Sequence, residues 1–386
     1  MQLPNGGFAP TTVSGTDDEL DAPGEVIYAL TQHYRRTGDR GFLREVWPTI
    51  SKASRYIADK RRSNRSADPK TREILPASRS AEDIGSPNLQ HYWDDFWCIR
   101  GLRDAAFVAG ELGDAGEAVR IRAEARGLLD ATWSSIRAVS SEHGISYIPN
   151  GPEELTSSAM ARGTTAGLWP CEVLDPRDPF VRQSFDVYWD KWVRSSGGGF
   201  NHKGNFWPYA GLDLAQCYLM LGQPNRAHRI LRWTIEHDPT GGFYSWPEGM
   251  DKKTLTLRVG DMPHGWFCAA YINLLRNMLF RESGDQILLF PNVPNDWLEP
   301  GKQISIADFP TLHGLISYRV RSSETAIELN IAANPGPPGG YRIILPSSIA
   351  AVAVDVDGRT EAFAQPKREL IIPSSARTVR IEIARR

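Results

Sequence analysis

The sequence contains few cysteines, and their spacing indicates neither disulfides nor a zinc site. Only four cysteines occur among 386 residues, and they are widely separated and lie mostly in apolar helical segments. There is no C-x-x-C pair, no other cluster of metal ligands and no phosphate-binding loop. We therefore expect reduced cysteines in the core, no bound metal and no organic cofactor.

Long hydrophobic runs and an excess of basic residues are also absent. No segment approaches the roughly 18 consecutive apolar residues that a membrane helix needs, and the start, MQLPNGGFAP, lacks the basic and apolar regions of a signal peptide. The 44 Lys and Arg residues nearly balance the 46 Asp and Glu residues, for a net charge of −2. We therefore expect a cytoplasmic protein that binds neither nucleic acid nor membranes.

Tryptophan, in contrast, is abundant, with twelve residues in the chain. A large aromatic core accounts for this number, and so does a carbohydrate site, because the face of an indole ring packs well on the C–H face of a sugar. Composition alone favours the core.

The first three quarters of the chain has the periodicity of helices joined by loops rich in glycine and proline. The loops carry most of the aromatic and acidic residues, as expected where a helical scaffold bears function on its connections. The predicted helices cover about 22–38, 41–62, 95–112, 115–136, 157–168, 178–194, 209–221, 224–237 and 263–281.

After about residue 284 the pattern changes to alternating apolar and polar residues. The segment GLISYRVRSSETAIELNIAA reads as a β-hairpin, and Asp357-Gly358 is a strong turn signal between two further strands. We therefore predict an α-helical domain over 1–283 and an antiparallel β-sandwich over 284–386.

The segment YWDDFW, residues 92–97, places two carboxylates among aromatic rings where a helix is expected to begin. Hydrolysis of a glycosidic bond needs one protonated carboxyl and one ionised carboxylate. Burial against Trp93 and Trp97, together with repulsion between Asp94 and Asp95, would raise the pKa of an aspartate and keep it protonated near neutral pH. Asp94 is our candidate for that acid.

Helix capping is the ordinary explanation for an aspartate at this position. Both explanations hold if Asp95 caps a helix that begins near Phe96 while Asp94 projects into a cavity. The sequence leaves open which of the two would be the acid.

The candidate for the second carboxylate lies in the segment SWPEGMDKKTLTLRVGDMPHGWF. Glu248 follows Trp246-Pro247 in a loop, and His264 and Trp266 stand at the expected start of a helix. Taken singly, Glu248 has the character of a solvated loop residue and His264 that of a structural histidine. A third aromatic loop sets Trp207 and Tyr209 before another helix.

These segments, in this order, resemble the (α/α)6-barrel glycoside hydrolases, especially the trehalase and processing α-glucosidase I group. The likeness to α-L-rhamnosidases and amylo-α-1,6-glucosidases is looser. The segment HYRRTGDRGFLREVWPTISKASRYI is similar to a helix pair common to these barrels. The segment that begins FPNVPNDWLEP is similar to the β-domain that follows the barrel in rhamnosidase-like enzymes.

The resemblance implies a role for each motif. Asp94, after Trp93, matches the general acid; Trp207-Pro208 matches a W-P loop; and Glu248, before Gly265-Trp266, matches the general base. It also implies an inverting reaction, with the two carboxyls about 6.5–9.5 Å apart.

Two features depart from this pattern. A closed barrel of this type has twelve helices, whereas we find roughly nine, so we expect a chain that lacks the N-terminal part of a barrel, through a truncated gene, or one with shorter helices that the periodicity does not reveal. An incomplete barrel would expose apolar edges and implies self-association or a partner chain. In addition, the residues around Glu248 match no single family's base motif, so the sugar, anomer and linkage do not follow.

Our hypothesis is an inverting, exo-acting glycosidase whose (α/α)6-like domain precedes a β-sandwich. Asp94 would be the acid and Glu248 the base, with a small glycoside or oligosaccharide as substrate. The alternatives are a disaccharide phosphorylase, with phosphate in place of water, and a non-catalytic carbohydrate-binding or truncated barrel subunit. The predicted substrate-binding residues are Trp93, Asp95, Trp97, Trp207, Tyr209, Trp246, His264 and Trp266.

Overall fold

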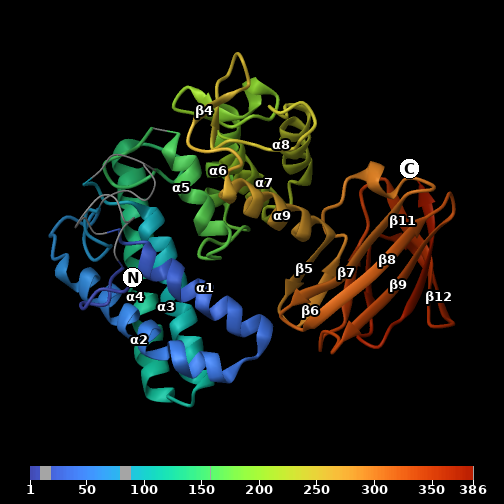
Figure 1. Cartoon of the computed structure of the whole chain (residues 1–386), viewed down its shortest axis with the longest axis horizontal. Helices are drawn as coiled ribbons and strands as arrows, with labels where there is room; N and C mark the ends of the chain where they lie inside the picture. The colour runs from blue at the N-terminus through green and yellow to red at the C-terminus, as the bar shows by residue number, and fades with distance from the viewer. Residues whose placement is uncertain (9–18, 79–87, 157, 386) are drawn as a thin grey trace. The chain divides into compact units, whose positions relative to one another are not determined.

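A computed structural model describes residues 1–8, 19–78, 88–156 and 158–385 of the chain. The chain divides into two compact units, Met1–Cys268 and Ala269–Arg386 (Figure 1). The first unit is mainly helical and the second is mainly β-sheet. The division falls within the last helix, fifteen residues before the boundary predicted from the sequence.

The described residues form nine α-helices, each overlapping one of the nine predicted segments. Their periodicity was readable because apolar residues recur at helical spacing along each one. The helices are α1 (Ala22–Thr37), α2 (Arg40–Ser63), α3 (Tyr92–Glu111), α4 (Ala115–His143), α5 (Ala159–Leu168), α6 (Pro179–Trp192), α7 (Pro208–Met220), α8 (Pro224–Glu236) and α9 (Gly265–Leu279).

Helices α1, α3, α5 and α7 pack against one another in series. Helix α2 packs on α1 and α3, α4 packs on α3, and α8 packs on α7. Helices α3 and α7 are buried on nearly every side, as expected for helices that are apolar around their whole circumference. Helices α2 and α8 bury one face and expose the other. Alternate helices therefore form the interior of the unit.

The contact between α1 and α3 depends on two glycines. A Cβ atom on Gly101 would lie 2.6 Å from the Cα of Gly24, and one on Gly24 would lie 2.3 Å from the carbonyl oxygen of Trp97. Two backbones approach this closely only where neither residue has a side chain. The start of α1 is therefore held against the first turns of α3.

Two helix starts differ from the prediction. Helix α3 begins at Tyr92 and its N-cap residue is His91, so Asp94 and Asp95 lie inside its first turn. The expectation that Asp95 caps the helix is wrong, because its side chain accepts a hydrogen bond from the backbone N–H of Leu75. Helix α9 begins at Gly265, so Pro263 precedes it.

Four short strands join two loops of the helical unit, and no pattern in the sequence predicted them. They are β1 (Asn201–His202), β2 (Asn205–Phe206), β3 (Gly249–Met250) and β4 (Leu257–Val259), paired in that order. Phe206 pairs with Met250. The small sheet therefore fixes the Trp207 loop beside the loop that carries Glu248.

The second unit contains two sheets that share one apolar core, as predicted for a β-sandwich. The six-stranded sheet is antiparallel throughout, whereas β10 and β6 of the four-stranded sheet run parallel. The strands are β5 (Phe280–Ser283), β6 (Gln286–Leu289), β7 (Gln303–Thr311), β8 (Gly314–Ser322), β9 (Ala326–Asn334), β10 (Tyr341–Ile344), β11 (Ile349–Val356), β12 (Arg359–Lys367), β13 (Glu369–Ile372) and β14 (Thr378–Arg385).

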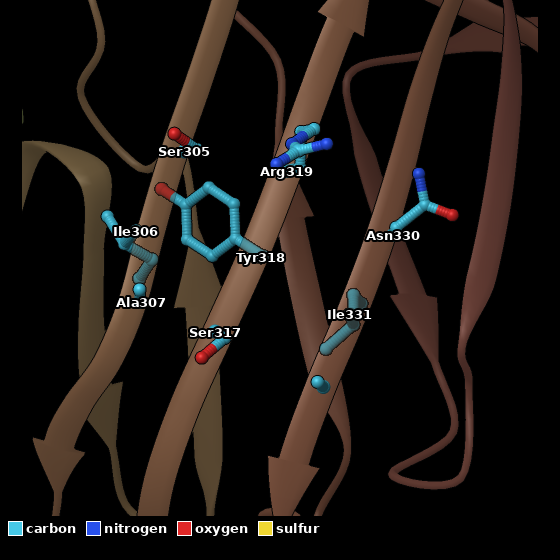
Figure 2. Close-up of a pocket in the computed structure, with 9 residues that line it drawn as sticks. Ser305, Ile306, Ala307, Ser317, Tyr318, Arg319, Asn330 and Ile331 are labelled. Atoms are coloured by element: carbon cyan, nitrogen blue, oxygen red, sulfur yellow. The ribbon is translucent and has the colours of Figure 1, made fainter.

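A hollow of about 470 Å³ lies over β7, β8 and β9 (Figure 2). Ser305, Arg319 and Asn330 are paired across these strands and are exposed. Tyr318, the residue before Arg319 on β8, is buried in the core. The predicted site residues all belong to the first unit, and none of them lines this hollow.

Three of the four cysteines are buried and free, as expected, but Cys268 is exposed. It shares a face of α9 with the exposed Ile272, because residues four apart lie on one side of a helix. The expectation that Cys268 is a core residue, which rested on its apolar sequence neighbours, is therefore wrong. No helix in the described part of the chain is long and apolar enough to cross a membrane.

The glycine contact predicts an asymmetric response to alanine within α3. Gly101→Ala should lower the free energy of unfolding by about 1–3 kcal/mol, because the new methyl group would overlap the backbone of α1. Gly110→Ala in the same helix should leave stability unchanged or slightly raised, because its nearest neighbour would be 3.9 Å away. Urea unfolding measures both, and equal effects would contradict the close contact.

Candidate active site

The predicted site residues fall into two sets. Trp93, Asp94, Asp95 and Trp97 occupy the first turns of α3 and form the acid set. Trp207, Tyr209, Trp246, Glu248, His264 and Trp266 lie at the starts of α7 and α9 and in the loop before α9, and form the aromatic set. Helix α5 contacts both α3 and α7. Asp94 and Glu248, the predicted acid and base, thus belong to different sets.

Asp94 is buried, with only 1% of its surface exposed. Its Oδ2 accepts a hydrogen bond from the Ser78 hydroxyl at 2.6 Å, and its Oδ1 has no hydrogen-bond partner among the described residues. Burial raises the pKa of Asp94 well above the ordinary value, and the nearby Asp21 and Asp95 carboxyls raise it further. Each of these effects favours the protonated form of this carboxyl.

Asp95 is equally buried and points elsewhere. Its Oδ1 accepts the Leu75 N–H at 2.9 Å. Burial raises the pKa of Asp95 to about 8, while the Leu75 hydrogen bond and the charge of Arg61 act against the rise. Asp95 is thus a second protonated carboxyl at neutral pH, engaged with the segment that precedes α3.

The two tryptophans of the acid set pack edge to face, with ring centroids 5.9 Å apart. The indole N–H of Trp93 donates to Oδ2 of Asp21 at 2.8 Å, and Tyr28 packs edge-on against Trp97. Both indoles are more than nine-tenths buried. Trp93 therefore ties Asp21, which the sequence analysis did not single out, to the first turn of α3.

The aromatic set surrounds a buried arginine. The guanidinium carbon of Arg162 lies 5.4 Å from the ring centroid of Trp207, 5.1 Å from that of Tyr209 and 5.5 Å from that of Trp266. Arg162 is 2% exposed, and cation–π contacts are stronger when desolvated. The three rings, predicted from three separate motifs, thus meet around one cation on α5.

His202 is a further buried polar residue beside this cage. Its Nδ1 is hydrogen-bonded to the Ser158 hydroxyl at 2.8 Å, and its ring meets that of Trp207 edge to face. Burial lowers the pKa of His202 to about 3, and the charge of Arg162 lowers it in the same direction. The imidazole is therefore neutral and can act only as a neutral hydrogen-bonding group near pH 7.

Glu248 lies with Asp261 and His264 in a compact group. One potential ligand atom from each lies within 4.8 Å of the others, and His264 Nδ1 is 2.7 Å from Asp261 Oδ1. The backbone N–H of Glu248 donates to the Asp261 carbonyl. These are the donor types that bind divalent cations, so the group could hold one, although the sequence analysis named no metal ligands.

Tyr209 links this group to the aromatic cage. Its ring centroid lies 4.9 Å from that of His264 and 5.0 Å from that of Trp266. Trp246 instead stacks on Phe267 at 4.6 Å, and its indole N–H donates to the Thr234 carbonyl. One face of Trp246 is thus covered by protein.

Four polar residues of the site went unnoticed in the sequence: Asp21, Arg162, His202 and Asp261 as a partner of His264. The sequence contained a signal for Asp21 only. The segment LDAPGE places it before a proline at a helix start, a position typical of a helix cap. Arg162 and His202 carried no such signal, because only the tertiary packing brings them to the rings.

Comparison with known proteins shows the fold. No family model and no curated protein matches the sequence. Three solved α-L-rhamnosidase structures do match. The GH78 rhamnosidase of Bacillus sp. GL1 is 14% identical with a TM-score of 0.59, and the match covers 86% of this chain and 34% of that one. For the enzyme from Dictyoglumus thermophilum the identity is 11%, the TM-score 0.64 and the coverage 100% and 42%, and for the Streptomyces avermitilis enzyme complexed with L-rhamnose the identity is 15%, the TM-score 0.60 and the coverage 99% and 35%.

The fold of this chain is therefore similar to that of the matched part of these three enzymes, and the chain spans less than half the length of each. The rhamnosidases are the group that the sequence resembled more loosely. The closer resemblance to trehalases stays a prediction.

The raised pKa of Asp95 predicts a stability that falls with rising pH. The pKa of Asp95 is about 8 in the folded protein and 3.8 in an ordinary environment. Between pH 3.8 and pH 8, folding therefore takes up a proton and becomes less favourable as the pH rises. Asp95→Asn has the same shape without the charge. It should reduce the slope of the free energy of unfolding against pH by up to about 1.4 kcal/mol per pH unit.

Urea unfolding between pH 5 and pH 8 measures that slope. Asp59→Asn is the control, because the Asp59 side chain is 74% exposed. Equal slopes in the parent and in Asp95→Asn would show that Asp95 ionises normally.

Proposed function

We propose that this chain carries the active site of an inverting, exo-acting glycoside hydrolase, with Asp94 as the general acid and Glu248 as the general base. The observation that carries the proposal is the buried, proton-holding carboxyl of Asp94 at the start of an interior helix. An acid that protonates a departing sugar oxygen must retain its proton until the bond breaks.

The environment of Asp94 supports this role. Ser78 donates to one oxygen, and the other oxygen has no partner among the described residues. A protonated carboxyl in this state has a free position from which it can donate to a glycosidic oxygen. Trp93 and Trp97 exclude water around it, which keeps the proton in place.

Glu248 has the contrasting environment that a base needs. Glu248 is half-buried. Its carboxylate lies against Gly260, since a Cβ atom on Gly260 would be 1.9 Å from Oε2 of Glu248. Asp261 and His264 provide hydrogen-bonding groups nearby. In this role Glu248 takes a proton from a water molecule as that water attacks the sugar carbon, while Asp94 gives its proton to the leaving oxygen.

The aromatic set would form the sugar-binding surface. Trp207, Tyr209 and Trp266 hold their relative positions through Arg162, and a rigid aromatic wall suits the apolar face of a sugar. Because the structural relatives are α-L-rhamnosidases, aryl α-L-rhamnosides are the first substrates to test, followed by α-glucosides and trehalose.

A second candidate function is carbohydrate binding without hydrolysis. It is favoured by the 1% exposure of Asp94, because a carboxyl closed off from solvent has no access to substrate unless the site opens. Calorimetry with the same sugars distinguishes the candidates, since binding without any product would support this second function.

The acid and base assignments predict large losses of rate. Asp94→Asn and Glu248→Gln should each lower kcat by about 10²–10⁴-fold, because each removes a proton transfer and preserves shape. Asp251→Asn is the matched control, since Asp251 caps its own exposed turn in the Glu248 loop. Parental activity in Asp94→Asn on a glycoside with an alkyl or sugar leaving group, measured by release of reducing sugar, would refute the assignment of the acid, because such a leaving group needs the proton.

The inverting mechanism predicts the configuration of the first product. Proton NMR during hydrolysis should show the anomer opposite to that of the substrate before mutarotation, because water attacks the face opposite the leaving group. A retained anomer would rule out inversion. Turnover that requires inorganic phosphate would indicate a phosphorylase instead.

A further inference from the structure

Asp21 occupies the N-cap position of α1 but does not cap it. Its backbone is in the helical region, and its side chain accepts no capping hydrogen bond. A capping aspartate normally binds N–H groups of the first turn. The Asp21 side chain binds the Trp93 indole at 2.8 Å instead, and the residue is only 4% exposed. A carboxylate is thus buried at the start of α3 for a reason other than helix capping.

The fold holds this carboxylate in place. Gly24, three residues after Asp21, touches the backbone of α3 at Trp97 and Gly101. The Cys98 thiol also donates to the carbonyl of Leu20, the residue before Asp21. Contacts on both sides of Asp21 therefore fix its distance from the first turn of α3, where Asp94 lies.

The groups that act on this pair are mainly acidic. Asp94 is influenced by the Ser78 hydroxyl from the segment before α3, by Asp95 on α3 itself, and by Asp21 and Glu25 at the start of α1. Glu19 acts on Asp21 from the same side. The nearby cation, Arg61 of α2, acts on Asp95. Two carboxyls that share a buried region do not both ionise readily, so one keeps its proton.

The hydrogen bond from the Trp93 indole favours ionisation of Asp21, as the bond from the Ser78 hydroxyl does for Asp94. A hydrogen bond from a neutral N–H stabilises the charged form of its acceptor, and the Trp93 N–H is directed at Asp21. Burial raises the pKa of Asp21 to about 6, against the pull of this hydrogen bond. Asp21 is therefore mostly ionised at pH 7, whereas burial and the Asp21 charge both favour the protonated form of Asp94.

We propose that Asp21 is a positioning residue for the general acid: its ionised carboxylate, held by the Trp93 indole N–H, keeps the proton on Asp94. This inference rests on the proposed function. It assigns Asp21 no contact with the reacting atoms, and it makes the negative charge, not the shape, of the side chain the feature that matters.

The pH dependence of hydrolysis tests the role of this charge. Asp21→Asn retains the capping preference and an oxygen that can accept the Trp93 N–H, but it removes the charge. The basic limb of the kcat/KM profile, where the general acid loses its proton, should move to lower pH by about one unit. The acidic limb, which reports the base, should stay in place. Asp39→Asn at the N-cap of α2 is the matched control, and it should move neither limb.

A second measurement does not depend on activity. In protein labelled with ¹³C at aspartate carboxyls, the Asp94 resonance is identified by its loss in Asp94→Asn, and its titration midpoint should fall in Asp21→Asn. Asp21→Glu should restore part of the parental value because it restores the charge.

An unchanged midpoint in Asp21→Asn would overturn the inference, whatever the activity. A lowered midpoint combined with full activity in Asp94→Asn would leave the coupling of the two carboxyls intact and refute the proposed function. A lowered midpoint with an inactive Asp94→Asn and a shifted basic limb is the result we expect.

Discussion

The burial of carboxyl groups at the start of α3 is the constraint on which the rest of the site depends. Asp94 and Asp95 are each 1% exposed, and an ionised carboxylate in such surroundings is strongly unfavourable unless it is paired. The helix N-terminus favours negative charge by only about 0.3–1 kcal/mol. Protonation is one way to reduce the penalty, so burial favours the protonated form of both groups, and the Asp21 carboxyl favours it further at Asp94.

Such a group can be positioned only if the backbone around it is rigid. The glycine contact between α1 and α3, the Leu75 N–H on Asp95 and the Ser78 hydroxyl on Asp94 each join α3 to a different segment. The short strands β1–β4 do the same for the second set, because they tie the Trp207 loop to the Glu248 loop. Loop residues thereby acquire fixed positions without belonging to a helix.

The sequence predicted the elements well and their contacts poorly, for a physical reason. Apolar periodicity identified each of the nine described helices, and strand alternation identified the β-hairpins. These patterns record burial within one segment. The parallel pairing of β10 with β6 and the two-residue strands β1–β3 depend on a partner distant in the chain, and no local pattern records such a partner.

The same distinction applies to the candidate site. Asp94 and the aromatic residues could be selected because unusual residue types adjoin one another in YWDDFW and MPHGWF. Asp21 and Arg162 stand in ordinary contexts, as an apparent helix cap and as a helical arginine. Their importance arises from the Trp93 indole and from three rings on other segments. The sequence therefore identified the residues with unusual neighbours along the chain and missed those with unusual neighbours in space.

In the proposed function, the separation of charge between the two sets favours acid catalysis by Asp94. A cation within about 4–6 Å of a carboxyl lowers its pKa and would remove the proton from Asp94. The described electrostatic influences on Asp94 are carboxyls and a hydroxyl. The buried cation Arg162 acts instead on Asp213 and His202 and is surrounded by ring faces. The rings add cation–π contacts to this buried positive charge. In the proposed function this cation belongs to the sugar-binding wall, and the described influences on the acid Asp94 include no cation.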